Sequence, residues 1–137
     1  MTIFLLMNNK SHIKTHFLFQ KETYELNGIA FDIHSTLGRG FLEIVYKDAF
    51  EYELKKRGIH FEREKEYVVE YKNIILPHKF YADFVVKGKI IAEIKAQSGI
   101  AENHYGQVIN YLAVSKCPIG LIYNFGEPSL IVKRVIF

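Results

Sequence analysis

The sequence contains a single cysteine, Cys117, among its 137 residues. A disulfide within the chain is therefore excluded, and so is a zinc site built from several cysteines. One free cysteine is typical of a reducing compartment, and we expect a cytoplasmic protein. The apolar run at residues 3–7 is too short for a signal-peptide core or a membrane span, so no membrane partner is expected.

Prolines are also scarce, with three in the chain, and neither sign of charge dominates, because the net charge is only +3. Hydrophobic residues make up 49% of the sequence, which is ordinary for a globular protein and argues against disorder of the whole chain. The length suits one domain. We expect that domain at residues 22–137 and interpret residues 1–21 as an N-terminal extension that is partly disordered.

Hydrophobic periodicity predicts the elements of this domain. Apolar residues at helical spacing predict helices, whereas runs rich in β-branched and aromatic residues predict strands. Asn73 and Pro77 are expected to break the chain before the second strand. The expected helices cover residues 22–36, 41–57 and 99–115, and the expected strands cover 67–71, 80–86, 89–96, 119–124 and 130–137. The fold class is thus α/β with a mixed sheet, in the order α-α-β-β-β-α-β-β.

The tripeptide Asp/Glu-x-Lys occurs three times, at residues 53–55, 70–72 and 93–95. The first lies on a predicted helix, and the second has no partner carboxylate across an obvious turn. Only Glu93-Ile94-Lys95 lies on a predicted hairpin with another acid, Asp83. We therefore place the candidate site on this hairpin.

A three-residue turn centred on Gly88 sets Asp83 opposite Glu93, and alternation along the strand puts Lys95 on their face. Two carboxylates about 5 Å apart repel by about 3 kcal/mol at an effective dielectric near 20. In an otherwise apolar hairpin this pair calls for a cation, which Mg²⁺ or Mn²⁺ would supply better than Lys95 alone. A metal ion there would hold a phosphate oxygen and lower the pKa of a bound water. From the hairpin alone, three solvent-facing edge charges remain an equal alternative.

Two helices carry further candidates. Glu43 falls in the first turn of the second helix, where an acid also suits the helix dipole without any catalytic role. On the third helix, His104, Gln107 and Tyr111 share one face beside an apolar stripe. Such a stripe lines a cleft or marks an ordinary boundary between core and solvent.

Several blocks of sequence resemble one known family, the GxxExxY proteins of the PD-(D/E)xK nuclease superfamily. The blocks are Gly40-Phe41-Leu42-Glu43-Ile44-Val45-Tyr46 and residues 81–86, 91–96, 104–112 and 124–126. The resemblance extends from about residue 22 to the C-terminus, and the spacing of its blocks makes it more specific than any single motif. Ala82 stands where the family has a proline before its first acid, a residue that metal binding does not require.

The resemblance implies a restriction-endonuclease-like core and a nuclease that hydrolyses phosphodiester bonds in DNA or RNA. It implies Asp83 and Glu93 as metal ligands, with catalytic roles for Lys95, Glu43, Gln107 and Tyr111. A non-catalytic module that binds nucleic acid or protein on the same scaffold is the alternative, because fold similarity does not establish cleavage. A defence-associated or toxin-like component is a weaker third option. A homodimer or a protein partner stays open.

Overall fold

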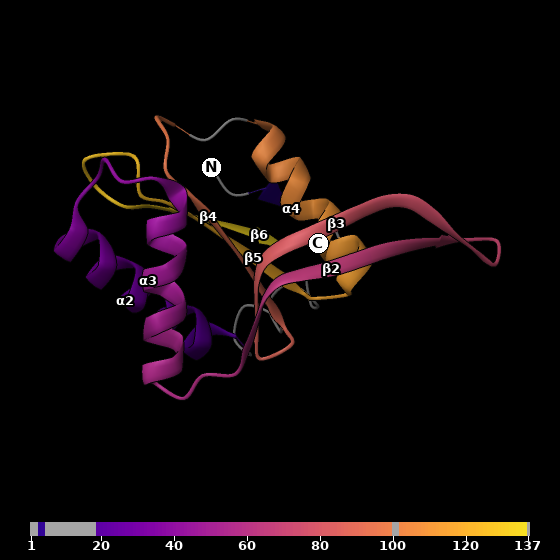
Figure 1. Ribbon diagram of the computed structural model, residues 1–137, viewed down its shortest axis with the longest axis horizontal. Helices are drawn as coiled ribbons and strands as arrows, with labels where there is room; N and C mark the ends of the chain where they lie inside the picture. Colours follow the sequence, from indigo (N-terminus) through magenta and orange to yellow (C-terminus); the bar gives the residue numbers. More distant parts are fainter. Residues whose placement is uncertain (1–2, 5–18, 100–101, 137) are drawn as a thin grey trace.

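In the computed structural model, residues 3–4, 19–99 and 102–136 are described, and they build one mixed sheet with helices on both faces (Figure 1). The strand order across the sheet is β1-β6-β5-β4-β3-β2. The elements are β1 (Ile3–Phe4), α2 (Gln20–Leu37), α3 (Glu43–Lys56), β2 (Phe61–Tyr71), β3 (Ile74–Val86), β4 (Ile90–Lys95), α4 (Glu102–Ser115), β5 (Ile119–Asn124) and β6 (Ile131–Ile136). From α2 onward this is the order predicted from the sequence.

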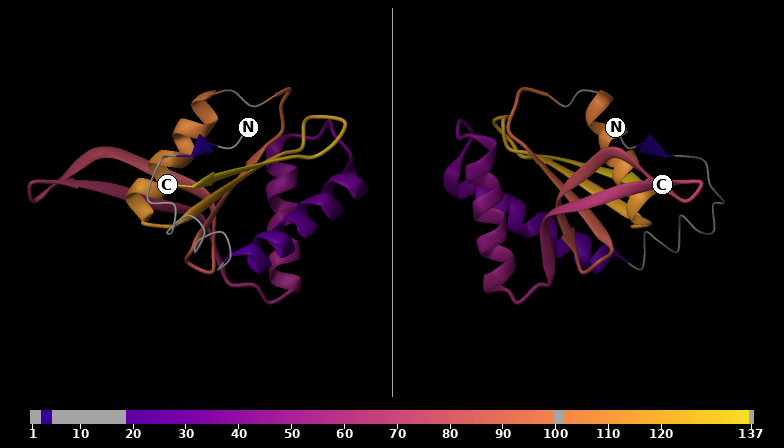
Figure 2. Two further views of the ribbon diagram at one scale, coloured as in Figure 1. Left: turned by 180° about the vertical axis from the view of Figure 1, so that it is seen from behind. Right: turned by 45° about the vertical axis from the view of Figure 1, so that its right-hand side comes forward.

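Helices α2 and α3 cover one face of the sheet and α4 covers the other, as both views in Figure 2 show. The larger core lies under α2 and α3, where Phe50 packs against Phe84 and Tyr123. The smaller core lies under α4, where Val108 and Leu112 are buried. No helix in the described part of the chain is long and apolar enough to cross a membrane.

Strands β4 and β5 are parallel, and α4 connects them across one face of the sheet. Such a crossover brings the carboxyl end of β4 and the start of α4 to the same edge. Residues at the end of β4 and on the first turns of α4 are therefore neighbours. This edge carries the candidate residues of both elements.

Strands β2 and β3 form a long hairpin that projects beyond the body of the molecule (Figure 1). The prediction that Pro77 breaks the chain before this strand was wrong, because β3 begins at Ile74 and includes Pro77. The register shifts there: Val68 pairs with Lys79, whereas Glu70 pairs with Ile75. A proline is tolerated at such a bulge because its missing N–H leaves no ladder hydrogen bond unmade.

The N-terminal extension expected at residues 1–21 lies mostly outside the described residues. Two of its residues, Ile3 and Phe4, pair in parallel with Val135 and Ile136 of β6. Helix α2 begins at Gln20, two residues before the expected domain boundary. The boundary itself remains a prediction.

Candidate active site

Asp83 and Glu93 face each other on β3 and β4 at the point where the ladder between these strands ends. The observed pairs run from Val86 with Ile90 to Phe84 with Ala92, and the same register places Asp83 opposite Glu93. Beyond these pairs, carboxylate oxygens rather than backbone carbonyls accept the hydrogen bonds of the strand amides. The Asp83 amide donates to Glu93 Oε1 over 2.8 Å, and the Ile94 amide donates to Asp83 Oδ2 over 2.8 Å.

Each carboxylate is therefore fixed by an amide of the opposite strand, and both are almost completely buried, with exposed fractions of 7% for Asp83 and 2% for Glu93. Charge-assisted hydrogen bonds of this kind hold a carboxylate in one orientation. The second oxygen of Asp83, Oδ1, stays available for a cation.

Lys47 of α3 supplies that cation, which the sequence did not indicate. Its Nζ lies 2.9 Å from Asp83 Oδ1, 3.4 Å from Glu64 Oε1 and 3.5 Å from Glu43 Oε2. The Lys47 side chain is only 13% exposed, so its ammonium is enclosed by carboxylates from α3, β2 and β3. The sequence predicts that Lys95 supplies part of the charge that offsets the acidic pair, whereas in the structure Lys47 makes the direct contact with Asp83.

Glu64 was also missed, and the reason is local backbone geometry. Its φ of 52° lies in the left-handed region, which a glutamate seldom adopts. Glu64 is left out of the ladder between the pairs Arg63 with Phe84 and Lys65 with Ala82. This irregularity directs the Glu64 carboxylate to Lys47, although the sequence around it alternates like an ordinary edge strand.

The turn before α3 places Glu43. Gly40 has a φ of 114°, and the hydroxyl of the buried Tyr46 donates to Gly38 O over 2.7 Å and accepts from the Phe41 amide over 3.2 Å. The ring of Tyr46 stacks on Phe125 at 4.6 Å. The glycine and the tyrosine of Gly-x-x-Glu-x-x-Tyr therefore fix the turn from which Glu43 starts the helix.

Lys95, at the end of β4, lies beside α4. Its Nζ donates to Gln107 Oε1 over 3.2 Å, so two of the predicted site residues meet here. His104, from the same helix, has its Nε2 3.4 Å from Gln97 Nε2. Burial, and after it the positive charge of Lys95, lower the pKa of His104. Thus His104 and Gln107 belong to the surroundings of Lys95.

Tyr111 lies one turn further along α4 and is 5% exposed. Burial, followed by the negative charges of Glu93 and Asp83, raises the pKa of its hydroxyl well above the ordinary value. Tyr111 is protonated at neutral pH, as an unperturbed tyrosine also is, and its hydroxyl lies close enough to the acidic pair to feel its charge. The seven residues singled out in the sequence therefore lie around this edge of the sheet.

The pKa values of Glu93 and Lys47 are both raised, which favours the neutral form of the carboxyl group and the charged form of the amine. Burial, and then the nearby Asp83 carboxylate, raise the pKa of Glu93 well above its ordinary value. Burial alone would lower the pKa of Lys47, but the hydrogen bond to Asp83 and the charges of Asp83, Glu64 and Glu43 outweigh it and raise that pKa. The acidic pair therefore favours a shared proton or a bound cation.

Asn124 holds the segment that follows Lys95. It is fully buried, and its Oδ1 accepts from the amides of Gln97 and Gly126, while its Nδ2 donates to the carbonyls of Gln97 and Gly99. A Cβ on Gly126 would collide with the backbone of Gln97, so only glycine allows this close approach. These contacts give the block at residues 124–126 a structural role.

The donor chemistry fits a hard divalent cation. Mg²⁺ commonly takes one or two protein carboxylates and keeps several waters, and Asp83 and Glu93 supply two carboxylates on adjacent strands. Within residues 3–4, 19–99 and 102–136, no group of three or more His, Cys, Asp or Glu side chains is arranged as a metal cluster. The fit to Mg²⁺ therefore rests on Asp83 and Glu93.

Comparisons with known proteins agree with this architecture. A family model described as the PD-(D/E)XK nuclease superfamily matches residues 20–135. A solved structure described as the crystal structure of SSO0001 has a TM-score of 0.56 and 19% identity, covering 89% of this chain and 61% of that one. The chain therefore spans about three fifths of that protein's length, and the likeness concerns the fold alone. A search of curated proteins finds no match.

The family match covers the helices α2 to α4 and the strands from β2 to β6, up to Val135. Nucleases of this superfamily typically use divalent metals. The restriction-endonuclease-like mixed sheet expected from the sequence is confirmed. The chain belongs to the PD-(D/E)XK nuclease superfamily.

Proposed function

We propose that this protein is a metal-dependent nuclease that hydrolyses phosphodiester bonds in DNA or RNA, and that it belongs to the GxxExxY branch of its superfamily. The observation that carries the proposal is the pair Asp83 and Glu93, each fixed by an amide of the opposite strand, with Lys95 two residues further along β4. The free cysteine Cys117 is in keeping with a reducing, cytoplasmic setting.

Asp83 and Glu93 would hold Mg²⁺ or Mn²⁺, which when bound would polarise the scissile phosphate and lower the pKa of a water molecule. Glu43 approaches from α3 and adds negative charge beside Asp83. Its contact with Lys47 also keeps that ammonium close to the same carboxylates. We assign Glu43 an indirect part in the binding of the cation.

Lys95 would place its positive charge against the phosphate as negative charge develops in the transition state. Gln107 accepts a hydrogen bond from Lys95 Nζ and thereby limits the directions in which the ammonium can point. Tyr111, which carries its proton at neutral pH, would donate a hydrogen bond at the same edge. Gln107 is thus a positioning residue, whereas Lys95 would touch the substrate.

The experiment is a cleavage assay on single- and double-stranded DNA and RNA with Mg²⁺, Mn²⁺ or EDTA. We expect cleavage with either metal, none in EDTA, and none in Asp83→Asn. Lys55→Ala is the matched control, because this lysine lies on α3 with a 68% exposed side chain. Absence of cleavage on all four substrates with both metals would refute the proposal.

One observation favours a second candidate, a non-catalytic module that binds nucleic acid or protein. Lys47 Nζ already lies among three carboxylates, where a cation would be expected. A site closed permanently by this ammonium would bind no metal. Metal-independent binding of a nucleic acid without cleavage would support this candidate.

A further inference from the structure

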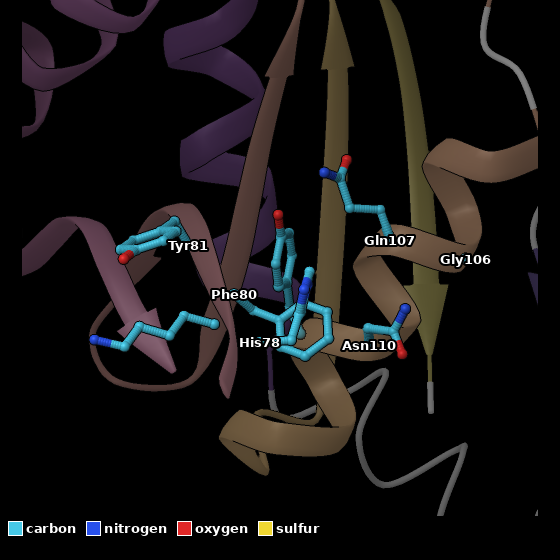
Figure 3. A pocket seen from close by; sticks show the side chains of 8 residues that line it. His78, Phe80, Tyr81, Gly106, Gln107 and Asn110 are labelled. Atoms are coloured by element: carbon cyan, nitrogen blue, oxygen red, sulfur yellow. The ribbon is translucent and has the colours of Figure 1, made fainter. Parts of the chain in front are cut away.

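An open groove lies directly beside the candidate active site, between β3 and α4. Its volume is about 530 Å³, which falls within the range of about 300–1,000 Å³ typical of ligand sites. Figure 3 shows His78 and Phe80 from β3 and Gln107 and Asn110 from α4 around the same space, whereas Tyr81 points to the other side of the strand. Of the residues that line this groove, the proposed reaction uses only Gln107 and Tyr111.

The groove is continuous with the proposed active site through two of its lining residues. Gln107 lines it and also accepts the hydrogen bond from Lys95 Nζ. Tyr111 lines it too, and its hydroxyl pKa is raised in part by the charges of Glu93 and Asp83. If a phosphate of a bound nucleic acid reached Lys95, the adjacent nucleoside would therefore lie at this groove.

The groove carries a row of aromatic rings that leads from His78 and Phe80 of β3 to Tyr111 of α4. His78 meets Phe80 at 4.7 Å with the rings inclined by 70°, and Phe80 meets Tyr111 at 6.1 Å with an angle of 84°. The edge-to-face contacts hold Phe80 between two neighbours while it remains partly exposed. Aromatic side chains beside a backbone-binding site are where unstacked bases pack in single-stranded nucleic acids.

Polarity and charge agree with a base as the occupant. None of the eight residues that line the groove is acidic, in contrast to the carboxylates around Lys47. Asn110 is exposed on α4 and offers both a donor and an acceptor, as the edge of a nucleobase requires. A base inside a duplex is stacked and paired, so neither its faces nor its Watson–Crick edge is free for such contacts.

We propose that this groove binds an unstacked nucleobase and that the substrate is single-stranded DNA or RNA, or a strand end that has frayed. This inference rests on the proposed nuclease function, because the active site fixes where the phosphate lies. Phe80 provides the surface for stacking, and Asn110 contacts the edge of the base. Both are specificity-determining residues.

The test is equilibrium binding, by fluorescence anisotropy, of short single-stranded DNA and RNA oligonucleotides and of the corresponding blunt duplexes. Measurements are made at one salt concentration, in EDTA and again in Ca²⁺. We expect single strands to bind at least tenfold more tightly than duplexes. Phe80→Leu keeps an apolar side chain against Tyr111 but removes the ring, and Asn110→Ala keeps a good helix former.

Each variant should lose about tenfold or more in affinity for single strands, as expected when one base contact is removed, with little change for duplexes. Tyr71→Ala, which removes an exposed ring outside the groove, is the control and should bind like wild type. Duplexes that bind as tightly as single strands, unchanged affinity in both groove variants, or no binding by the wild-type protein would overturn the proposal.

The two proposals can fail separately. Tight, groove-dependent binding of single strands without metal-dependent cleavage would refute the nuclease and retain the base site. Cleavage confined to duplexes would retain the nuclease and refute the base site. A series of oligonucleotides of the preferred type, each with one abasic position, gives an independent check. Removal of the base at one position should lower the binding affinity more than removal at the others.

Discussion

Replacement of Lys47 by methionine tests how the buried charges are balanced. Lys47→Met keeps most of the length and the apolar stem of the side chain but removes the ammonium. Its 2.9 Å contact with Asp83 Oδ1 joins two side chains that are only 13% and 9% exposed. Glu43 and Glu64 are 42% and 50% exposed, so water would compensate them for most of the lost interaction.

The loss of stability in Lys47→Met is therefore mainly due to the charge of Asp83, which is left without its partner. Removing one partner of a buried ion pair typically costs about 3–5 kcal/mol, because the other charge is left uncompensated. We expect about 3 kcal/mol, the low end of this range, because Asp83 also accepts a hydrogen bond from the Ile94 amide. With an unfolding entropy of about 2.1 cal/mol/K per residue, 137 residues give about 0.29 kcal/mol per degree. The melting temperature should fall by about 10 °C.

Thermal unfolding in EDTA and in millimolar Mg²⁺ is the assay. A metal ion bound to Asp83 competes with the Lys47 ammonium, so Mg²⁺ should stabilise Lys47→Met more than it stabilises wild type. A tenfold gain in metal affinity corresponds to about 1.4 kcal/mol, or about 5 °C of additional shift at saturating metal. Lys55→Met, on the exposed side of α3, should match wild type in both conditions.

Two results would refute this reasoning. A melting temperature of Lys47→Met in EDTA equal to that of Lys55→Met would show that the ion pair contributes nothing to stability. An equal Mg²⁺ response in wild type and Lys47→Met would show that ammonium and metal do not share the carboxylates.

Three further predictions concern other parts of the site. Lys95→Ala should retain the Mg²⁺-dependent rise in melting temperature but lose about 100-fold or more in single-turnover cleavage; loss of both would make Lys95 structural. Glu93→Gln keeps an oxygen for the Asp83 amide and removes a carboxyl group whose pKa is raised by burial and Asp83. A carboxyl group whose pKa is raised in the folded state stabilises the fold at low pH, and this stabilisation is lost as the pH rises above the unfolded-state pKa of about 4.3. The stability of Glu93→Gln relative to wild type, measured in EDTA, should therefore increase between pH 4 and 8. A constant difference in melting temperature between the two proteins over this range would contradict the prediction. Gly126→Ala should cost about 1–3 kcal/mol, measured by urea unfolding, because its Cβ meets the rigid backbone of Gln97; Gly28→Ala is the control, since nothing lies within 4 Å of its Cβ.

Hydrophobic spacing and residue type predicted the order of the elements from α2 to β6, because helices and strands that bury one face repeat their apolar residues with different periods. Strands β2 and β3 each begin six residues earlier than expected. The turn at residues 87–89 then fixed the register of β3 and β4. This is a local property of the chain, and it sufficed to set Asp83 opposite Glu93. Pro77 was misinterpreted because the bulge that accommodates it depends on the partner strand β2.

The sequence by itself therefore determined the hairpin, its two acids and the lysine that follows them. Only the tertiary structure decided which cation neutralises the pair, because Lys47 reaches Asp83 through the packing of α3 against the sheet. Glu64 joins them through a backbone conformation that no side-chain pattern specifies. Gln107 meets Lys95 because the crossover helix returns over the end of β4. Contacts between segments far apart in the chain depend on how whole elements pack, and periodicity carries no information about that.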